Sequence, residues 1–188
     1  MPSLSRLMFA ATLLFLTQAV ASAQGGQWKL PNKKASPPKP AVRSEWQHPE
    51  RACSLLADIP GMQTRGYKNR SSMPKEYFCS SPYKSVSDGW PSENNIAYYV
   101  VGDHDTAWEL RLVLNVDYKH TAEIAQNVLA VASNLLTKRA LGATLSVEVL
   151  QTLLSGNTGK WDAGENQILI EREEWPNGRG YLMKFIIR

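Results

Sequence analysis

The sequence predicts a single α+β domain whose helices pack mainly on one face of an antiparallel sheet. Two pairs of strand-like segments, residues 96–117 and 167–187, predict two β-hairpins. Segments with helical spacing occupy about residues 49–59, 121–139 and 146–154. The chain has 188 residues, 43% of them hydrophobic, which suits one globular domain, and we place it at residues 44–188.

The first 23 residues have the pattern of a cleaved secretory signal peptide. Arg6 is their only charged residue, an apolar run follows from about Leu7 to Leu16, and Ala21-Ser22-Ala23 forms a small-x-small cleavage pattern. The alternative is an uncleaved anchor, but the apolar run is short for a membrane span of about 20 residues. We therefore expect a periplasmic or secreted protein with no stable membrane span after cleavage.

Residues 24–43 are expected to form a basic, proline-rich disordered tail. They contain Gly-Gly, four prolines and five Lys or Arg residues. This composition buries too little apolar surface to offset the entropy of ordering. The tail is either a spacer or a weak contact for anionic surfaces.

The formal charge of +4 belongs to the N-terminal segments and not to the domain. Six of the 21 Lys and Arg residues precede Ser44, whereas all 17 Asp and Glu residues follow it. This leaves 15 cations against 17 anions, a net charge of −2 for residues 44–188. A nucleic-acid partner is therefore not expected, since phosphate binding needs a basic surface.

The two cysteines, Cys53 and Cys79, are expected to form a disulfide in an oxidising compartment. Closing the 53–79 loop would stabilise the domain by about 3.5 kcal/mol in the chain-entropy model. The alternative is a pair of reactive thiols, but neither cysteine lies in a C-x-x-C motif. Cys53 falls within the first helix, which Pro60-Gly61 should end, and Cys79 closes a short strand candidate at Tyr77–Cys79.

The core is expected where strand alternation and helical spacing are clearest. One face of the strand at residues 107–117 carries Trp108, Leu110, Leu112, Leu114 and Val116. The helix at 121–139 should cover the sheet with its apolar repeat, which consists of Ile124, Val128, Val131 and Leu135 with Leu136 beside them. The helix at 146–154 has Leu150, Leu153 and Leu154. The last strand has Tyr181, Met183, Phe185 and Ile187 on one face.

Two motifs resemble catalytic or ligand sites but are better explained as turns. Asp103-His104-Asp105 lies between two strand-like runs, and all its residues suit a hairpin turn, whereas metal ligands must converge. The segment at 155–161, SGNTGKW, follows a helix, whereas a phosphate loop precedes one. We expect no catalytic residue, no metal ligand and no cofactor.

The carboxylates of Glu171, Glu173 and Glu174 form the only acidic cluster that invites an enzymatic interpretation. Glycosidases use paired carboxylates, although these require a substrate cleft. A solvated face near a sheet edge explains the cluster more simply. An envelope glycan hydrolase that uses Glu and Asp carboxylates of the hairpin at residues 165–174 is therefore the alternative hypothesis.

Three tryptophans, Trp90, Trp161 and Trp175, lie in or beside loops and are candidate partner-binding residues. Exposed aromatic side chains anchor protein partners and glycans. They can equally close the edge of the core, which is a common use of tryptophan.

The runs NNIAYYVVGD and WELRLVLNV, the long helix after them, and the paired FCSS and ACSLL segments resemble small exported bacterial domains of unassigned function. The resemblance covers about residues 51–188. It implies secretion, one α+β domain and a disulfide, and it transfers no catalytic residue.

These observations predict an exported, disulfide-stabilised binding or accessory domain without catalytic activity. Its partner would be an envelope or secreted macromolecule. A third possibility is a stable module whose 24–43 tail tethers it to anionic surfaces.

Overall fold

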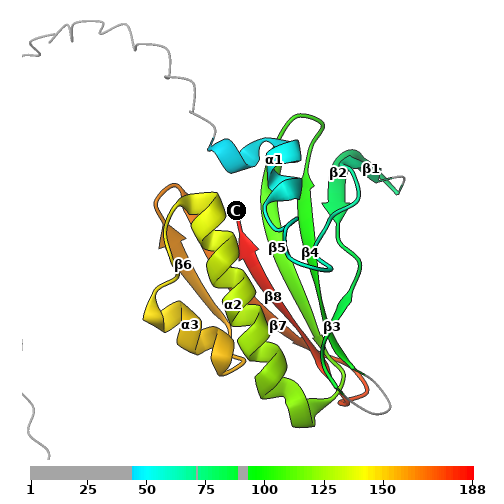
Figure 1. Cartoon of the computed structure of the whole chain (residues 1–188), viewed down its shortest axis with the longest axis vertical. Helices are drawn as coiled ribbons and strands as arrows, with labels where there is room; N and C mark the ends of the chain where they lie inside the picture. Colours follow the sequence, from blue (N-terminus) through cyan, green and yellow to red (C-terminus); the bar gives the residue numbers. More distant parts are fainter. Residues whose placement is uncertain (1–43, 71, 89–92) are drawn as a thin grey trace, which may run out of the picture. The chain divides into compact units, whose positions relative to one another are not determined.

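The computed structural model describes residues 44–70, 72–88 and 93–188, and it confirms a single α+β domain with an antiparallel sheet (Figure 1). The expected signal peptide, the expected tail and Trp90 lie outside the described residues. Eight strands form the sheet in the order β1-β2-β4-β5-β8-β7-β6, with β3 also paired to β4.

The two predicted hairpins form the centre of the sheet. The first joins β4 (Asn94–Gly102) to β5 (Ala107–Val116), and the second joins β7 (Asn166–Glu174) to β8 (Tyr181–Ile187). Strands β5 and β8 pair with each other, with Leu112 opposite Phe185. Alternate residues of these strands therefore project onto one face, where they build the core.

Three short outer strands of the sheet were not predicted. They are β1 (Lys68–Arg70), β3 (Lys84–Ser87) and β6 (Gly159–Ala163), whereas β2 (Met73–Ser80) contains the expected strand at 77–79. Strands β2 and β3 pair with different parts of β4, so they share one edge of that strand. These three strands have only three to five residues and little apolar alternation, which is the usual sequence signal.

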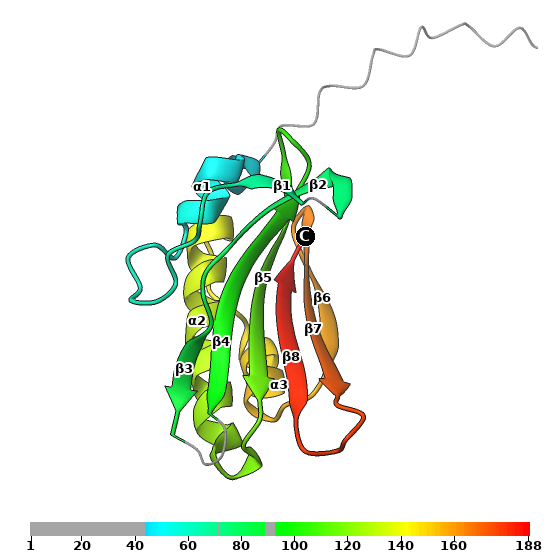
Figure 2. The ribbon, with the colours of Figure 1, turned by 90° about the vertical axis from the view of Figure 1, so that its right-hand side faces the viewer.

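Three α-helices and two 3₁₀ turns complete the domain. They are η1 (Glu45–Gln47), α1 (Pro49–Ser54), η2 (Lys119–Thr121), α2 (Ala122–Leu141) and α3 (Val147–Leu154). In Figure 2 the strands lie in front of α2 and α3, so these helices cover one face of the sheet. The opposite face has no helix over it in the described part of the chain.

The first helix ends at Ser54, five residues earlier than predicted. The carbonyl groups at its end have partners elsewhere: Thr64 donates to the carbonyl of Cys53, and Arg139 donates to that of Leu55. These tertiary contacts replace the hydrogen bonds of further helical turns. Leu55 and Leu56 are nevertheless buried.

The predicted core position of Trp108 is wrong, because its side chain is 45% exposed. Val101 pairs with Glu109 and Gly102 pairs with Ala107, so Trp108 is the additional residue of a β-bulge. A bulge shifts the alternation of a strand by one residue. Ala107 consequently occupies the core at this end of β5, and Leu110, Leu112 and Leu114 keep their predicted positions.

The disulfide between Cys53 and Cys79 is present, with the two Cα atoms 6.2 Å apart. It joins α1 to β2, and both cysteines belong to the core. The α1 segment is thereby fixed to the sheet by a covalent bond as well as by packing.

Candidate functional site

Part of the predicted apolar repeat of α2 faces away from the sheet, contrary to our prediction, whereas Leu135 packs against the core and Leu136 is fully buried. Ile124 is 54% exposed and Val131 is 71% exposed. The buried face of the helix consists mostly of small residues, with Ala125, Leu129, Ala132, Ser133 and Leu136 against the core. Small side chains let the helix approach the sheet closely, with Leu129 and Leu136 in the core and Ile124 and Val131 left outside. We call Ile124, Val128, Val131 and Leu135 the α2 stripe.

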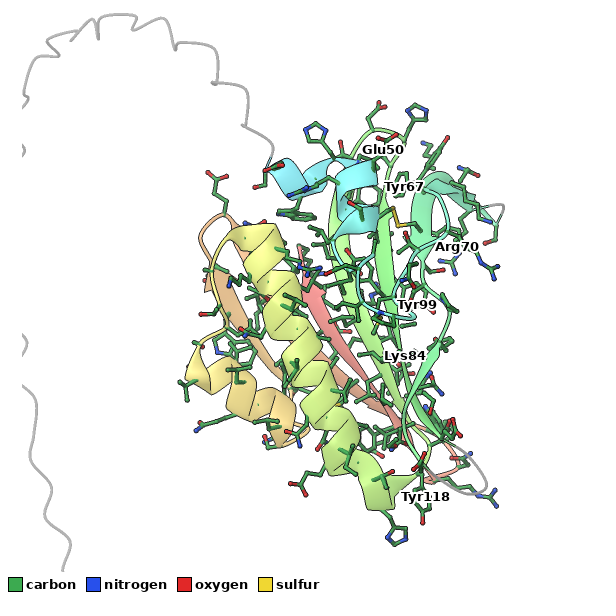
Figure 3. All side chains as sticks on the ribbon, viewed as in Figure 1. Glu50, Tyr67, Arg70, Lys84, Tyr99 and Tyr118 are labelled. Carbon is green, nitrogen blue, oxygen red and sulfur yellow. A yellow bond between two sulfur atoms is a disulfide. The ribbon has the colours of Figure 1, made fainter. Side chains whose placement is uncertain are left out.

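An apolar groove lies beside the α2 stripe, between α2, β3 and the turns that follow α1. It encloses about 310 Å³, which is at the small end of the range for ligand pockets. Lys84, labelled in Figure 3, lines it from β3, and the aliphatic stem of this lysine packs on Gly61. The other lining residues are Ile59, Met62, Val86, Ile96, Asn127, Val128, Val131, Ala132 and Leu135. The groove and the α2 stripe form one continuous surface, since Val128, Val131 and Leu135 belong to both.

This helix has no charged residue between Glu123 and Lys138. The uncharged stretch includes outward-facing positions such as Asn127 and Val131. Helices that face solvent normally carry charged residues on the outer face. Depletion of charge around exposed aliphatic residues is instead typical of the centre of a protein interface. The absence of charge along this helix is a sequence signal that could have located the surface. Using it would have required a comparison of the helix face rich in small residues with the face that carries larger aliphatic ones.

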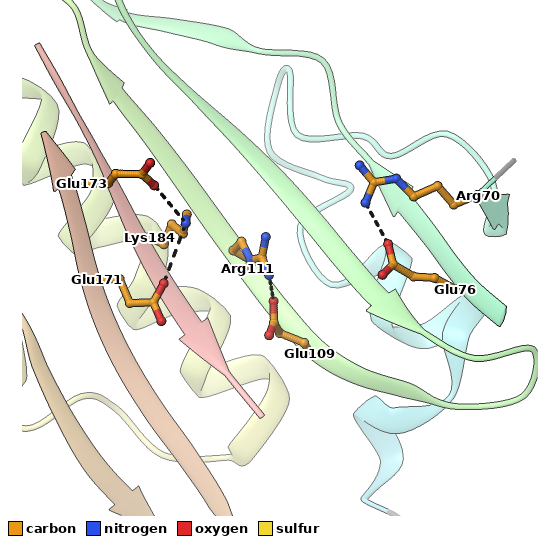
Figure 4. A network of polar contacts seen from close by, with 7 residues as sticks. All are labelled: Arg70, Glu76, Glu109, Arg111, Glu171, Glu173 and Lys184. Atoms are coloured by element: carbon orange, nitrogen blue, oxygen red, sulfur yellow. Dashed lines mark hydrogen bonds and ion pairs between the residues drawn. The ribbon is translucent and has the colours of Figure 1, made fainter. Parts of the chain in front are cut away.

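The opposite face of the sheet is covered by charged side chains of the strands themselves (Figure 4). Lys184 on β8 lies 3.8 Å from the carboxylate of Glu171 and 3.6 Å from that of Glu173. Arg111 forms an ion pair with Glu109 farther along this face. These long side chains cover the aliphatic residues between them, so that Val113 and Ile186 are buried although no helix lies over them. This face therefore resembles ordinary protein surface.

The glutamates of the alternative hydrolase hypothesis are all engaged with cations. Glu171 and Glu173 share Lys184, and Glu174 binds Arg172. These residues belong to the part of β7 that extends beyond its pairing with β6, which ends at Ile170. The cluster therefore lies at a local sheet edge, as its composition indicated.

Trp161 and Trp175 lie at different places in the domain and do not form one site. The ring of Trp161 packs on Gly159 and lines a cavity of about 470 Å³ beside Val149 of α3. The ring of Trp175 packs on Gly180 and lines a separate cavity of about 540 Å³. Both rings are half-buried and cover a glycine, which gives them a packing role. Their use in partner binding stays a prediction.

The Asp103-His104-Asp105 segment forms the predicted hairpin turn. The Asp103 carboxylate accepts hydrogen bonds from the backbone N–H groups of Asp105, at 2.9 Å, and Thr106, at 2.8 Å. His104 is exposed, and its ring contacts that of Tyr77. Tyr67 donates to the Asp103 carbonyl, and burial, with smaller effects of Asp103 and Tyr77, raises the pKa of Tyr67 to about 12. The segment thus has a complete structural explanation.

No three His, Cys, Asp or Glu residues within the described ranges come together as a metal site would require. None of the helices described is long and apolar enough to cross a membrane.

The α2 stripe and groove remain the surface with the clearest capacity for binding. The chain matches no family model, no curated protein and no solved structure. Chemically, the surface offers aliphatic contacts along one helix and a recess beside it that can accept apolar side chains. Hydrogen-bonding groups are few there, so recognition at this surface would depend on shape and on burial of apolar area.

Proposed function

We propose that this chain is an exported, non-catalytic binding module that recognises an apolar segment of another envelope or secreted macromolecule through the α2 stripe and groove. The observation that carries the proposal is the 71% exposure of Val131 within an uncharged helical surface next to an apolar recess. Burying a side chain of this size stabilises a complex by about 1.5–3 kcal/mol before the costs of association.

The length of the α2 stripe favours a macromolecule over a compact ligand. Ile124 and Leu135 are eleven residues apart, which corresponds to about 16 Å along a helix. The adjoining recess is small by comparison, at about 310 Å³. A partner segment that follows the stripe and inserts one or two side chains into the groove would use both features. Such helix-in-groove recognition is a recurring mode of peptide binding.

Two features support export. The Cys53–Cys79 bond suits an oxidising compartment, and residues 1–23 have the composition of a signal peptide. Intact mass measurement of the protein from its native source tests this part of the proposal. We expect a chain that begins near Gln24 and is two protons lighter than its reduced form. A full-length chain with free thiols would contradict it.

A labelled amphipathic peptide with leucines at 3-4 spacing tests binding at the α2 surface. We expect wild-type protein to bind this peptide and not a scrambled peptide of equal composition, because only the first presents one apolar face. Val131→Asp should weaken binding at least tenfold, since it places a carboxylate beside the groove. Val147→Asp is a matched control, because Val147 is 70% exposed and lies on α3. Equal effects of the two substitutions would refute the site.

The non-catalytic part of the proposal is supported by the ion pairs that engage the clustered glutamates. We expect no release of soluble fragments when the protein is incubated with purified envelope glycans. Release that Glu171→Gln or Glu173→Gln abolishes would establish the hydrolase alternative instead.

A further inference from the structure

We infer that the partner of the α2 surface is a second copy of this chain. In this arrangement the two α2 helices lie antiparallel across a two-fold axis midway between Val128 and Val131. Ile124 of each chain then lies opposite Leu135 of the other, and Val128 lies opposite Val131. The inference rests on the proposed function, in which the α2 stripe and groove form a binding surface, and it names the occupant.

The spacing of the α2 stripe is that of a helix which packs against another helix. Ile124, Val128, Val131 and Leu135 recur at intervals of four, three and four residues. This is the alternation of a coiled-coil seam, whose residues insert between those of the facing helix. In the described part of the domain, no helix covers the exposed residues of this seam. Helix α3 packs against α2, but Ile124 and Val131 stay exposed.

The charges at the two ends of α2 favour an antiparallel second copy. Glu123 lies in the first turn and Lys138 in the last, and no charged residue lies between them. An antiparallel pair centred between Val128 and Val131 brings Glu123 of each chain close to the end of the other that carries Lys138. It also sets the two helix dipoles in opposite directions. A parallel pair would instead place like charges beside each other at both ends.

The groove is compatible with this pairing and less so with the N-terminal segment of the chain. In a two-fold dimer the same surface serves both copies, so the α2 stripe of each chain can lie along the groove of the other. Residues 24–43 carry five cations, and the charged residue that lines the groove, Lys84, is also a cation. Charge therefore disfavours the tail as the occupant.

Engineered cysteines test the pairing directly in the full mature chain, since both native cysteines are held in the disulfide. Val128 of each chain lies opposite Val131 of the other, so Val128→Cys mixed with Val131→Cys should give a cross-linked mixed dimer under mild oxidation. Val147→Cys, equally exposed on α3, should stay uncross-linked at the same protein concentration. Ile124→Cys alone should not cross-link, but mixed with Leu135→Cys it should give the mixed dimer. Self-cross-linking of Ile124→Cys would overturn the antiparallel arrangement.

Sedimentation velocity of the full mature chain provides the second measurement. We expect the mean mass to rise from one chain towards two as concentration increases. Val131→Asp should shift the dissociation constant at least tenfold towards monomer, and Val147→Asp should leave it unchanged. A wild-type protein that stays monomeric would overturn the self-pairing. The proposed binding function would then still be decided by the binding of the amphipathic peptide. A dimer unaffected by Val131→Asp would likewise refute the inference, because it would use another face.

Discussion

The hydroxyl of Tyr98 donates to the carbonyl of Ala52 over 2.8 Å, and both residues are fully buried. Tyr98 lies on β4 near the centre of the sheet, and Ala52 lies in α1. This hydrogen bond connects segments 46 residues apart at a point that water does not reach. Burial raises the pKa of Tyr98 well above its ordinary value, so the phenol remains a donor at any physiological pH.

We expect Tyr98→Phe to destabilise the domain by about 1 kcal/mol, because it removes a buried hydrogen bond while the Ala52 carbonyl keeps the one from the Leu55 N–H. Urea unfolding followed by circular dichroism measures the change. Tyr99→Phe is the matched control, since the Tyr99 hydroxyl donates to that of Tyr83 on the exposed side of the sheet. That substitution should change stability by less than about 0.5 kcal/mol. Similar losses for both variants would show that the Ala52 hydrogen bond contributes nothing of its own.

The Cys53–Cys79 bond predicts a marked loss of stability on reduction. Replacing both cysteines by alanine should lower the free energy of unfolding by about 3.5 kcal/mol from the entropy of the opened loop. Loss of the buried sulfur atoms adds to this cost, since both cysteines lie in the core. Reducing agent should lower the thermal midpoint of the wild type and leave that of the double variant unchanged. A wild type insensitive to reduction would contradict this role.

The sequence was informative where strand alternation is strong. Both central hairpins formed at the predicted positions, and Asp103-His104-Asp105 forms the turn between β4 and β5 because its side chains cap the backbone locally. Local chemistry of this kind is visible in the sequence itself. The disulfide followed from the number of cysteines and from the compartment that the leader suggests.

The orientation of α2 could not be obtained in the same way. Helical spacing shows that an apolar face exists, but α2 has two such faces, one with large aliphatic residues and one with Ala125, Leu129 and Ser133. Which of them meets the sheet depends on how closely the helix must pack, which is a tertiary property. Trp108 was misplaced for a similar reason, since a β-bulge depends on the partner strand. The candidate site was therefore missed because its residues looked like core.

The ion pair between Asp58 and Arg139 predicts a pH dependence of stability. The Arg139 guanidinium lies 2.8 Å from the Asp58 carboxylate, and this hydrogen bond is the main cause of a pKa of Asp58 below its ordinary value of 3.8. A lowered pKa means that the contribution is present above about pH 4 and is lost as the pH falls through the folded-state value. Asp58→Asn should lower the urea midpoint slightly near pH 6, and the difference should vanish as the pH falls through the lowered pKa of Asp58. A difference that persists in acid would show that the carboxylate charge is not its cause.

Gly156 and Gly164 have the same left-handed backbone conformation, with φ of +67°, but very different surroundings. A Cβ atom at Gly156 would lie 2.5 Å from Nε2 of Gln126 and 3.0 Å from Nη1 of Arg172, whereas one at Gly164 would have no neighbour within 4 Å. Gln126 donates to the hydroxyl of Tyr181 in the core, so its displacement would break a buried hydrogen bond.

We expect Gly164→Ala to cost about 1 kcal/mol from backbone strain alone. Gly156→Ala should cost about 2–4 kcal/mol, because the loss of the Gln126–Tyr181 contact adds to the same strain. Urea unfolding of the two variants gives the comparison. In a Gln126→Ala background, Gly156→Ala should cost only the backbone strain of about 1 kcal/mol, since the clash is removed and the Tyr181 contact is already lost. Equal destabilisation by the two single substitutions would mean that Gln126 moves aside freely and that its hydrogen bond to Tyr181 does not fix α2 on the sheet.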